Sequence, residues 1–194
     1  MSLSEHGKRA WLSALSAGLF VLGYPALGLW PLSFVFGVPL LLALERCSGR
    51  AWAGAAVGAL AGTLAQLAGY AWLLPTLARF SGLPAWGCAP IFGLFALYQG
   101  AAWGVASALA VRAAARGWPL AWAWVAAWTA VELFYPAIFP TPLAVSVHAV
   151  PTLLQVVELG GAGLLSALIA ACSAGLYTML RQRRAGLRSA VPVA

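Results

Sequence analysis

The chain alternates between long apolar segments and short stretches that carry charge, proline or glycine. Apolar segments of about twenty residues are typical of helices that cross a membrane, and shorter ones can pair as hairpins. We assign six such segments, which cover approximately residues 10–24, 29–44, 51–77, 85–114, 118–134 and 153–180. The pattern predicts an all-α, polytopic membrane protein whose core is a six-helix transmembrane bundle.

Proline and glycine mark the places where these helices should bend or stop. Pro39 lies inside the second segment and lacks a backbone donor, so we expect a kink near residues 35–39. Residues 70–84 combine aromatic side chains, Arg79 and two prolines, which favours a short interfacial helix or an exposed turn. Residues 135–152 contain four prolines and should hold no long helix.

Ten of the eleven basic residues fall in four patches that alternate with pairs of apolar segments, and Arg79 is the exception. The patches are Lys8 and Arg9; Arg46 and Arg50; Arg112 and Arg116; and Arg181, Arg183, Arg184 and Arg188. Because Lys and Arg in short loops stay on the cytoplasmic side, the pattern predicts three outward and return passes with both termini in the cytoplasm. We therefore expect a tail over residues 1–9, a membrane domain over residues 10–180 and a basic tail over residues 181–194. The first segment also resembles a signal peptide, but the charge pattern requires that it is retained.

Composition supports the same class of protein. The chain is 63% hydrophobic and 8% charged, and it contains neither Asp nor Asn, so a water-compatible surface cannot be built from it. The net charge of +7 is explained by orientation signals and contacts with anionic lipid headgroups, and we expect no nucleic-acid partner. Cys47, Cys88 and Cys172 are widely spaced, which favours packing roles over a disulfide framework or a metal site.

Glycines recur at intervals of four in two of the predicted helices. Gly54, Gly58 and Gly62 share one face of the third segment, and Gly100 and Gly104 share one face of the fourth. Small residues at this spacing let helix backbones approach closely in a membrane. We therefore predict that these glycines are helix-packing residues.

Polar chemistry collects toward the outer side of the predicted bundle. A candidate outer-face polar cluster consists of Arg79, Glu132, His148 and Glu158. Ionisable residues inside a span are candidates for function, because they are costly in hydrocarbon. The alternative is a structural role, in which the glutamates pair with Arg79 or accept hydrogen bonds from Gln155, Thr141 or backbone groups freed by the prolines. A dyad of Cys88 and His148 is a further, weaker alternative.

Missing residue types limit the chemistry that this chain can perform. The sequence has no Asp, its one lysine is Lys8, and neither GxSxG nor HExxH occurs. We therefore expect no catalytic residue, no metal and no cofactor in this chain.

Several ordered motifs give the chain a family resemblance. Residues 23–32, 70–73, 78–84, 97–100, 128–134 and 151–161 resemble, in the same order and spacing, the N-terminal membrane part of bacterial apolipoprotein N-acyltransferase. That resemblance implies a multi-pass protein of the bacterial inner membrane. It also implies a role in lipoprotein biosynthesis, where an acyl chain passes from a phospholipid to the N-terminal amine of a lipoprotein.

In that family a nitrilase-like domain with a Glu-Lys-Cys triad performs catalysis. The resemblance implies that this chain supplies the membrane platform and lipid-access surface, with a separate nitrilase-like polypeptide as partner, or that it is a truncated relative. Two alternatives remain open: a small transporter or lipid-handling protein that uses Glu132, Glu158 and Arg79, and a structural subunit whose glycine stripes bind other helices.

Overall fold

A computed structural model describes residues 4–25 and 27–189, and these residues form helices and turns without any strand. The α-helices are α1 (Glu5–Gly23), α2 (Gly37–Glu45), α3 (Ala51–Gly69), α4 (Leu73–Ser81), α5 (Ala85–Ala114), α6 (Leu120–Phe134), α7 (Pro151–Leu154) and α8 (Val156–Ser189). Two 3-10 helices, η1 (Trp30–Phe34) and η2 (Leu143–Val147), lie between them. The all-α prediction is confirmed.

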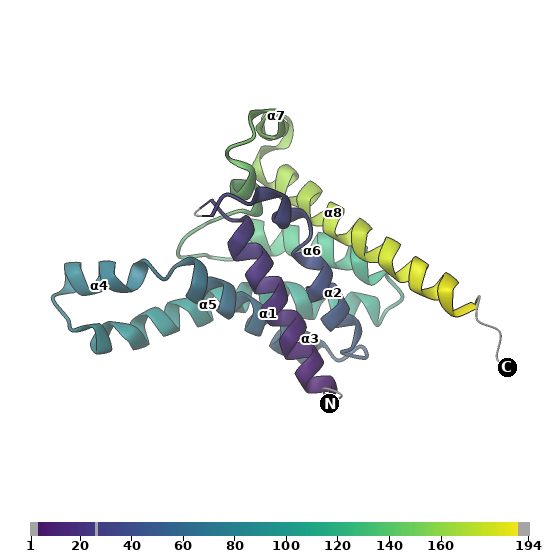
Figure 1. Ribbon diagram of the computed structural model, residues 1–194, viewed down its shortest axis with the longest axis horizontal. Helices are drawn as coiled ribbons and strands as arrows, with labels where there is room; N and C mark the ends of the chain where they lie inside the picture. The colour runs from purple at the N-terminus through teal and green to yellow at the C-terminus, as the bar shows by residue number, and fades with distance from the viewer. Residues whose placement is uncertain (1–3, 26, 190–194) are drawn as a thin grey trace.

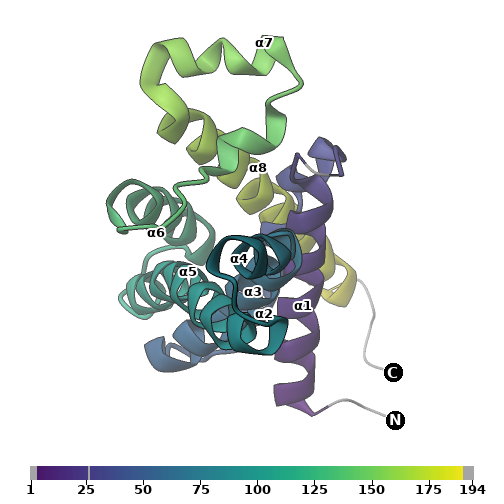
Figure 2. The same ribbon diagram turned by 90° about the vertical axis from the view of Figure 1, so that its left-hand side faces the viewer.

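The short helix α2 lies at the centre of the bundle (Figures 1 and 2). Helices α1, α3, α5, α6 and α8 follow one another in an arc of pairwise contacts, and each of them also touches α2. Its residues Leu40, Leu41 and Ala43 are fully buried. A helix that is apolar around its whole circumference fits this central position, because it has no polar face to turn outward.

Three helices are long and apolar enough to cross a membrane within the described parts of the chain: α3, α5 and residues 156–185 of α8. Two shorter apolar stretches, residues 30–45 and α6, accompany them. Helix α1, whose first turns carry Glu5, Lys8 and Arg9, is not among the three. The apolar helices thus indicate a membrane protein. Only three of the described helices are long and apolar enough to cross a membrane by themselves, whereas the sequence predicted six spans.

The second predicted segment is broken close to residues 35–39, where we expected a kink. The 3-10 helix η1 ends at Phe34 and α2 begins at Gly37, so Pro39 lies in the first turn of α2. A backbone N–H there would have no intrahelical acceptor, so the missing donor of proline costs no helical hydrogen bond. Serine hydroxyls from neighbouring helices support the break. Ser16 Oγ of α1 donates to the Phe36 carbonyl at 2.7 Å, and Ser173 Oγ of α8 donates to the Phe34 carbonyl at 2.8 Å.

Two other helix boundaries differ from the sequence prediction. The third segment was expected to continue to Leu77, but α3 ends at Gly69 and α4 starts at Leu73 after a turn. The sixth segment is interrupted inside α8, where Gly160 and Gly161 leave helical geometry and Gly161 has a φ of 70°. Glycine tolerates this left-handed conformation, so the helix changes direction there. At its other end α8 continues through residues 181–189 of the predicted basic tail.

The glycine stripes of α3 and α5 face each other. An added Cβ at Gly62 would lie 2.7 Å from the Gly100 carbonyl oxygen, and one at Gly104 would lie 3.0 Å from the Ala55 carbonyl oxygen. At Gly54 the corresponding distance to Val111 Cγ2 is 2.8 Å, and at Gly58 a Cβ would overlap Ser107 Oγ and the Trp103 carbonyl. Because the two stripes cover each other, they are not available to the outside helices that the structural-subunit alternative required.

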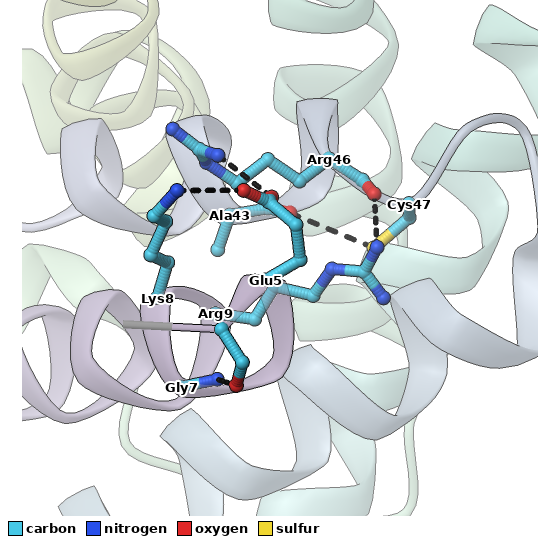
Figure 3. A network of polar contacts seen from close by, with 8 residues as sticks. Glu5, Gly7, Lys8, Arg9, Ala43, Arg46 and Cys47 are labelled. Carbon is cyan, nitrogen blue, oxygen red and sulfur yellow. Dashed lines mark hydrogen bonds and ion pairs between the residues drawn. The ribbon is translucent and has the colours of Figure 1, made fainter. Parts of the chain in front are cut away.

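Charged residues tie the start of α1 to the end of α2 (Figure 3). Glu5 accepts hydrogen bonds from Lys8 Nζ and Arg46 Nη1, each at 2.8 Å, and Arg9 donates to the Arg46 carbonyl. The two cations, Lys8 first, lower the pKa of Glu5 to about 2. Glu45, at the end of α2, pairs with Arg181 of α8. We call this end of the bundle the basic end.

We predict that Gly58→Leu lowers the free energy of unfolding by about 3 kcal/mol, because the backbone of α5 leaves no room for a side chain. Gly93→Ala is the matched control, since a Cβ there meets nothing within 4 Å and alanine favours the helix. Thermal unfolding in detergent, followed by circular dichroism, compares the two variants. Equal stability of both would contradict close α3–α5 packing.

Candidate functional site

A proline-rich segment closes one end of the bundle opposite the basic end. We define the proline strap as residues 135–147, which include Pro136, Pro140 and Pro142 and end in η2. Non-helical backbone at this depth must find hydrogen-bond partners within the protein. Helix α5 supplies two of them: Gln99 Nε2 donates to the Phe139 carbonyl and Gln99 Oε1 accepts from the Ile138 amide, both at 3.0 Å.

Tyrosines add further anchors to the same segment. Tyr98 of α5 donates to the Pro136 carbonyl at 2.6 Å, and Tyr135 donates back to the Tyr98 carbonyl at 2.7 Å. Tyr70, just after α3, donates to Thr141 Oγ1 at 3.0 Å. The strap is therefore held to α5 and to the end of α3 by side chains that point out of helical segments.

Glu132 of α6 and Ser166 of α8 hold the end of the strap. Glu132 Oε2 accepts from the Leu143 amide at 3.1 Å and from Trp128 Nε1 at 3.2 Å, and Ser166 Oγ accepts from the Ala144 amide at 3.0 Å. Leu143 directly follows Pro142, so Glu132 accepts a hydrogen bond from a backbone amide next to a proline. This is the structural alternative that the sequence left open for this residue.

Beneath the strap lies a half-open cavity of about 100 Å³. Helices α3, α5 and α6 contribute the polar side chains Gln66, Gln99 and Glu132 to its wall. Gln66 is only 6% exposed, and neither its Oε1 nor Glu132 Oε1 has a hydrogen-bond partner among the described residues. Both oxygen atoms are buried, so the side chains of the cavity wall include two acceptors that the described residues leave unpaired.

Aromatic rings form the floor of this cavity. Trp103 and Trp128 pack edge to face with centroids 4.9 Å apart, and Phe20 of α1 meets Trp103 at the same separation. Phe36, directly before α2, touches Trp103 and Trp128 from below. The ring cluster joins the polar wall to the central helix, so the site and the core of the bundle form one packed unit.

The structure distributes the predicted outer-face cluster over separate elements. Glu132 reaches the cavity and is partly buried, whereas Arg79 on α4, His148 after η2 and Glu158 before the α8 kink are exposed. Figure 1 shows α4 and the start of α5 extending away from the other helices, far from α7. Within the described residues, neither Glu132 nor Glu158 forms an ion pair with Arg79.

Cys88 does not meet His148. Its Sγ, near the start of α5, lies 3.7 Å from Ser81 Oγ and 3.8 Å from the Leu83 carbonyl oxygen. The three cysteines are all free, and no group of three possible metal ligands occurs among the described residues.

A family model of the apolipoprotein N-acyltransferase N-terminal domain matches residues 16–175. The chain belongs to this family. The matched range contains α2, α3, α5 and α6 entirely, together with the strap and its anchors. A comparison with curated proteins gives no match. The suspected family is thus confirmed, and with it an N-acyltransferase-like membrane domain.

Sequence reasoning missed several residues that build the site of this N-acyltransferase-like domain. Trp124 and Trp128 are 0% and 6% exposed and belong to the core of the bundle. Tyr98 and Ser166 hold the strap, although we had assigned them no role. These two residues could have been found from the sequence, because polar side chains are rare within an apolar span and need a hydrogen-bond partner inside the protein.

We predict that Gln99→Leu releases the strap, because the amide bridges two backbone groups that leucine leaves unpaired, at a cost of about 2 kcal/mol. Hydrogen exchange should accelerate in residues 136–141 and remain unchanged in α3. Tyr98→Phe, which removes one bond to the same strap, is the matched control and should have the smaller effect. Unchanged exchange in Gln99→Leu would refute this anchoring.

Proposed function

We propose that this chain is the membrane platform of an apolipoprotein N-acyltransferase system. In this role it brings a phospholipid and a lipoprotein together for acyl transfer at the outer face of the bacterial inner membrane. A separate nitrilase-like polypeptide supplies the Glu-Lys-Cys triad. This proposal rests on the family match over residues 16–175.

The arrangement of charge supports an orientation for this platform. Helix α6 begins beside Arg181 at the basic end and finishes at the proline strap, so strap and basic end lie at opposite ends of one helix. With the basic end in the cytoplasm, the strap and its cavity face the outer side. Helix α1, residues 30–45, α3, α5, α6 and α8 then make six crossings, with both termini inside.

The position of the lysine supports a separate catalytic unit. Lys8 pairs with Glu5 at the basic end, and the cavity wall contains Gln66, Gln99 and Glu132 but no Lys or Cys. An amide-forming acyl transfer needs a nucleophile and a base within hydrogen-bond reach of each other. We therefore assign these roles to the partner and assign substrate positioning to this chain.

Deletion in the native host tests the proposal directly. We expect lipoproteins to retain a free N-terminal amine, detectable by mass spectrometry, and we expect the tagged chain to co-purify with a nitrilase-like protein. Reintroducing the chain should restore N-acylation. Full acylation after deletion, in a strain without another transferase, would show that the chain has no part in this reaction.

The partly buried Glu132 at the cavity keeps the small transporter or lipid-handling protein as a second candidate. The two functions make opposite predictions for one substitution. In the platform, Glu132→Gln should leave N-acylation within about twofold of wild type, because an amide oxygen can still accept from Leu143 and Trp128. Glu132→Leu should lose the activity together with strap protection. In the transporter, Glu132→Gln should abolish flux in vesicles with the strap intact, and unchanged flux would remove this candidate.

A further inference from the structure

Two neighbouring grooves lie at the basic end, far from the proline strap. The first, of about 480 Å³, runs between the end of α2, the α5–α6 turn and α8, and its wall is largely apolar, with Leu44, Val111, Trp118 and Tyr177. The second, of about 630 Å³, runs between α2 and α8 and carries Arg46, Arg181 and Arg184. Both grooves include Glu45, Arg181 and Gln182, so they meet along one stretch of α8.

The second groove carries more positive charge than the protein neutralises. At the basic end the carboxylates are Glu5 and Glu45, and the ion pairs commit them to Lys8, Arg46 and Arg181. Arg184 is exposed and has no carboxylate partner among the described residues. An unpaired guanidinium beside two partly neutralised ones offers several donors to a phosphate oxygen.

The Arg181 side chain is held in place rather than free. Glu45 pairs with it, and Tyr177 donates to the other carboxylate oxygen of Glu45 at 3.3 Å. This chain of contacts fixes α8 against α2 at the point where the two grooves join. The boundary between the apolar and the basic wall is therefore a defined feature of the fold.

We propose that these grooves together bind one anionic phospholipid, with its phosphate in the basic groove and an acyl chain in the apolar groove. Charge complementarity selects the anionic headgroup, and the apolar wall selects a ligand that carries a hydrocarbon chain. Trp118, at the rim of the apolar groove, is 63% exposed, as expected of an aromatic side chain at a membrane interface. The site is distinct from the strap cavity and does not depend on the acyl-transfer proposal.

Native mass spectrometry of the detergent-purified chain tests this site. Phosphatidylglycerol and phosphatidylcholine with identical acyl chains are added at equal concentration, and we expect phosphatidylglycerol to be retained at least tenfold more strongly. The double variant Arg181→Gln/Arg184→Gln should weaken phosphatidylglycerol binding by about tenfold or more. Equal retention of the two lipids by the wild-type chain would overturn the proposal.

Two further variants separate the parts of the site. Ala114→Phe fills the apolar groove without changing charge and should also weaken binding of the lipid, while water-soluble glycerophosphoglycerol should bind poorly to every form. Arg79→Gln removes a cation from α4 and should leave binding unchanged. The assignment is wrong if Arg79→Gln weakens binding as much as the double variant, or if Ala114→Phe has no effect on a correctly folded chain.

Discussion

Backbone groups that leave helical geometry in an apolar environment must find partners within the protein, and the rest of this structure depends on that constraint. The break before α2 is supported by Ser16 and Ser173, and the proline strap by Gln99 and Glu132. A chain with so few polar residues places them where the helices stop. The same side chains tie α1, α5, α6 and α8 to segments distant in sequence, so satisfying the backbone also fixes the tertiary arrangement.

The central position of α2 follows from this constraint. The hydroxyl donors to the Phe34 and Phe36 carbonyls, just before α2, come from α8 and α1. These two helices lie at the ends of the arc, so the broken segment draws both ends toward the middle. Close contact between α3 and α5 then fills the opposite side, with Gly58 and Gly62 removing the side-chain volume that would separate the backbones. The ring cluster around Trp103 and Trp128 packs between these two parts of the bundle.

The two ends of the bundle have different chemistry. At the strap end, polar side chains bond to the backbone of the strap, and two unpaired acceptors belong to side chains that line a small cavity. At the basic end, arginines outnumber carboxylates and open grooves connect charge with apolar wall. The membrane platform that we propose would use this division, since it needs a rigid scaffold together with surfaces suited to lipid.

The sequence by itself determined the all-α class, the membrane setting, the family and the approximate extent of α5, because apolar length, charge placement and ordered motifs are local properties. It also identified the glycine faces, since a four-residue spacing fixes a helix face. Only the tertiary structure decided that those faces meet each other, that Trp124 and Trp128 are core residues, and that Glu132 alone of the predicted polar cluster reaches the cavity. Each of these depends on which elements lie side by side, and a pattern along one helix carries no information about its neighbour.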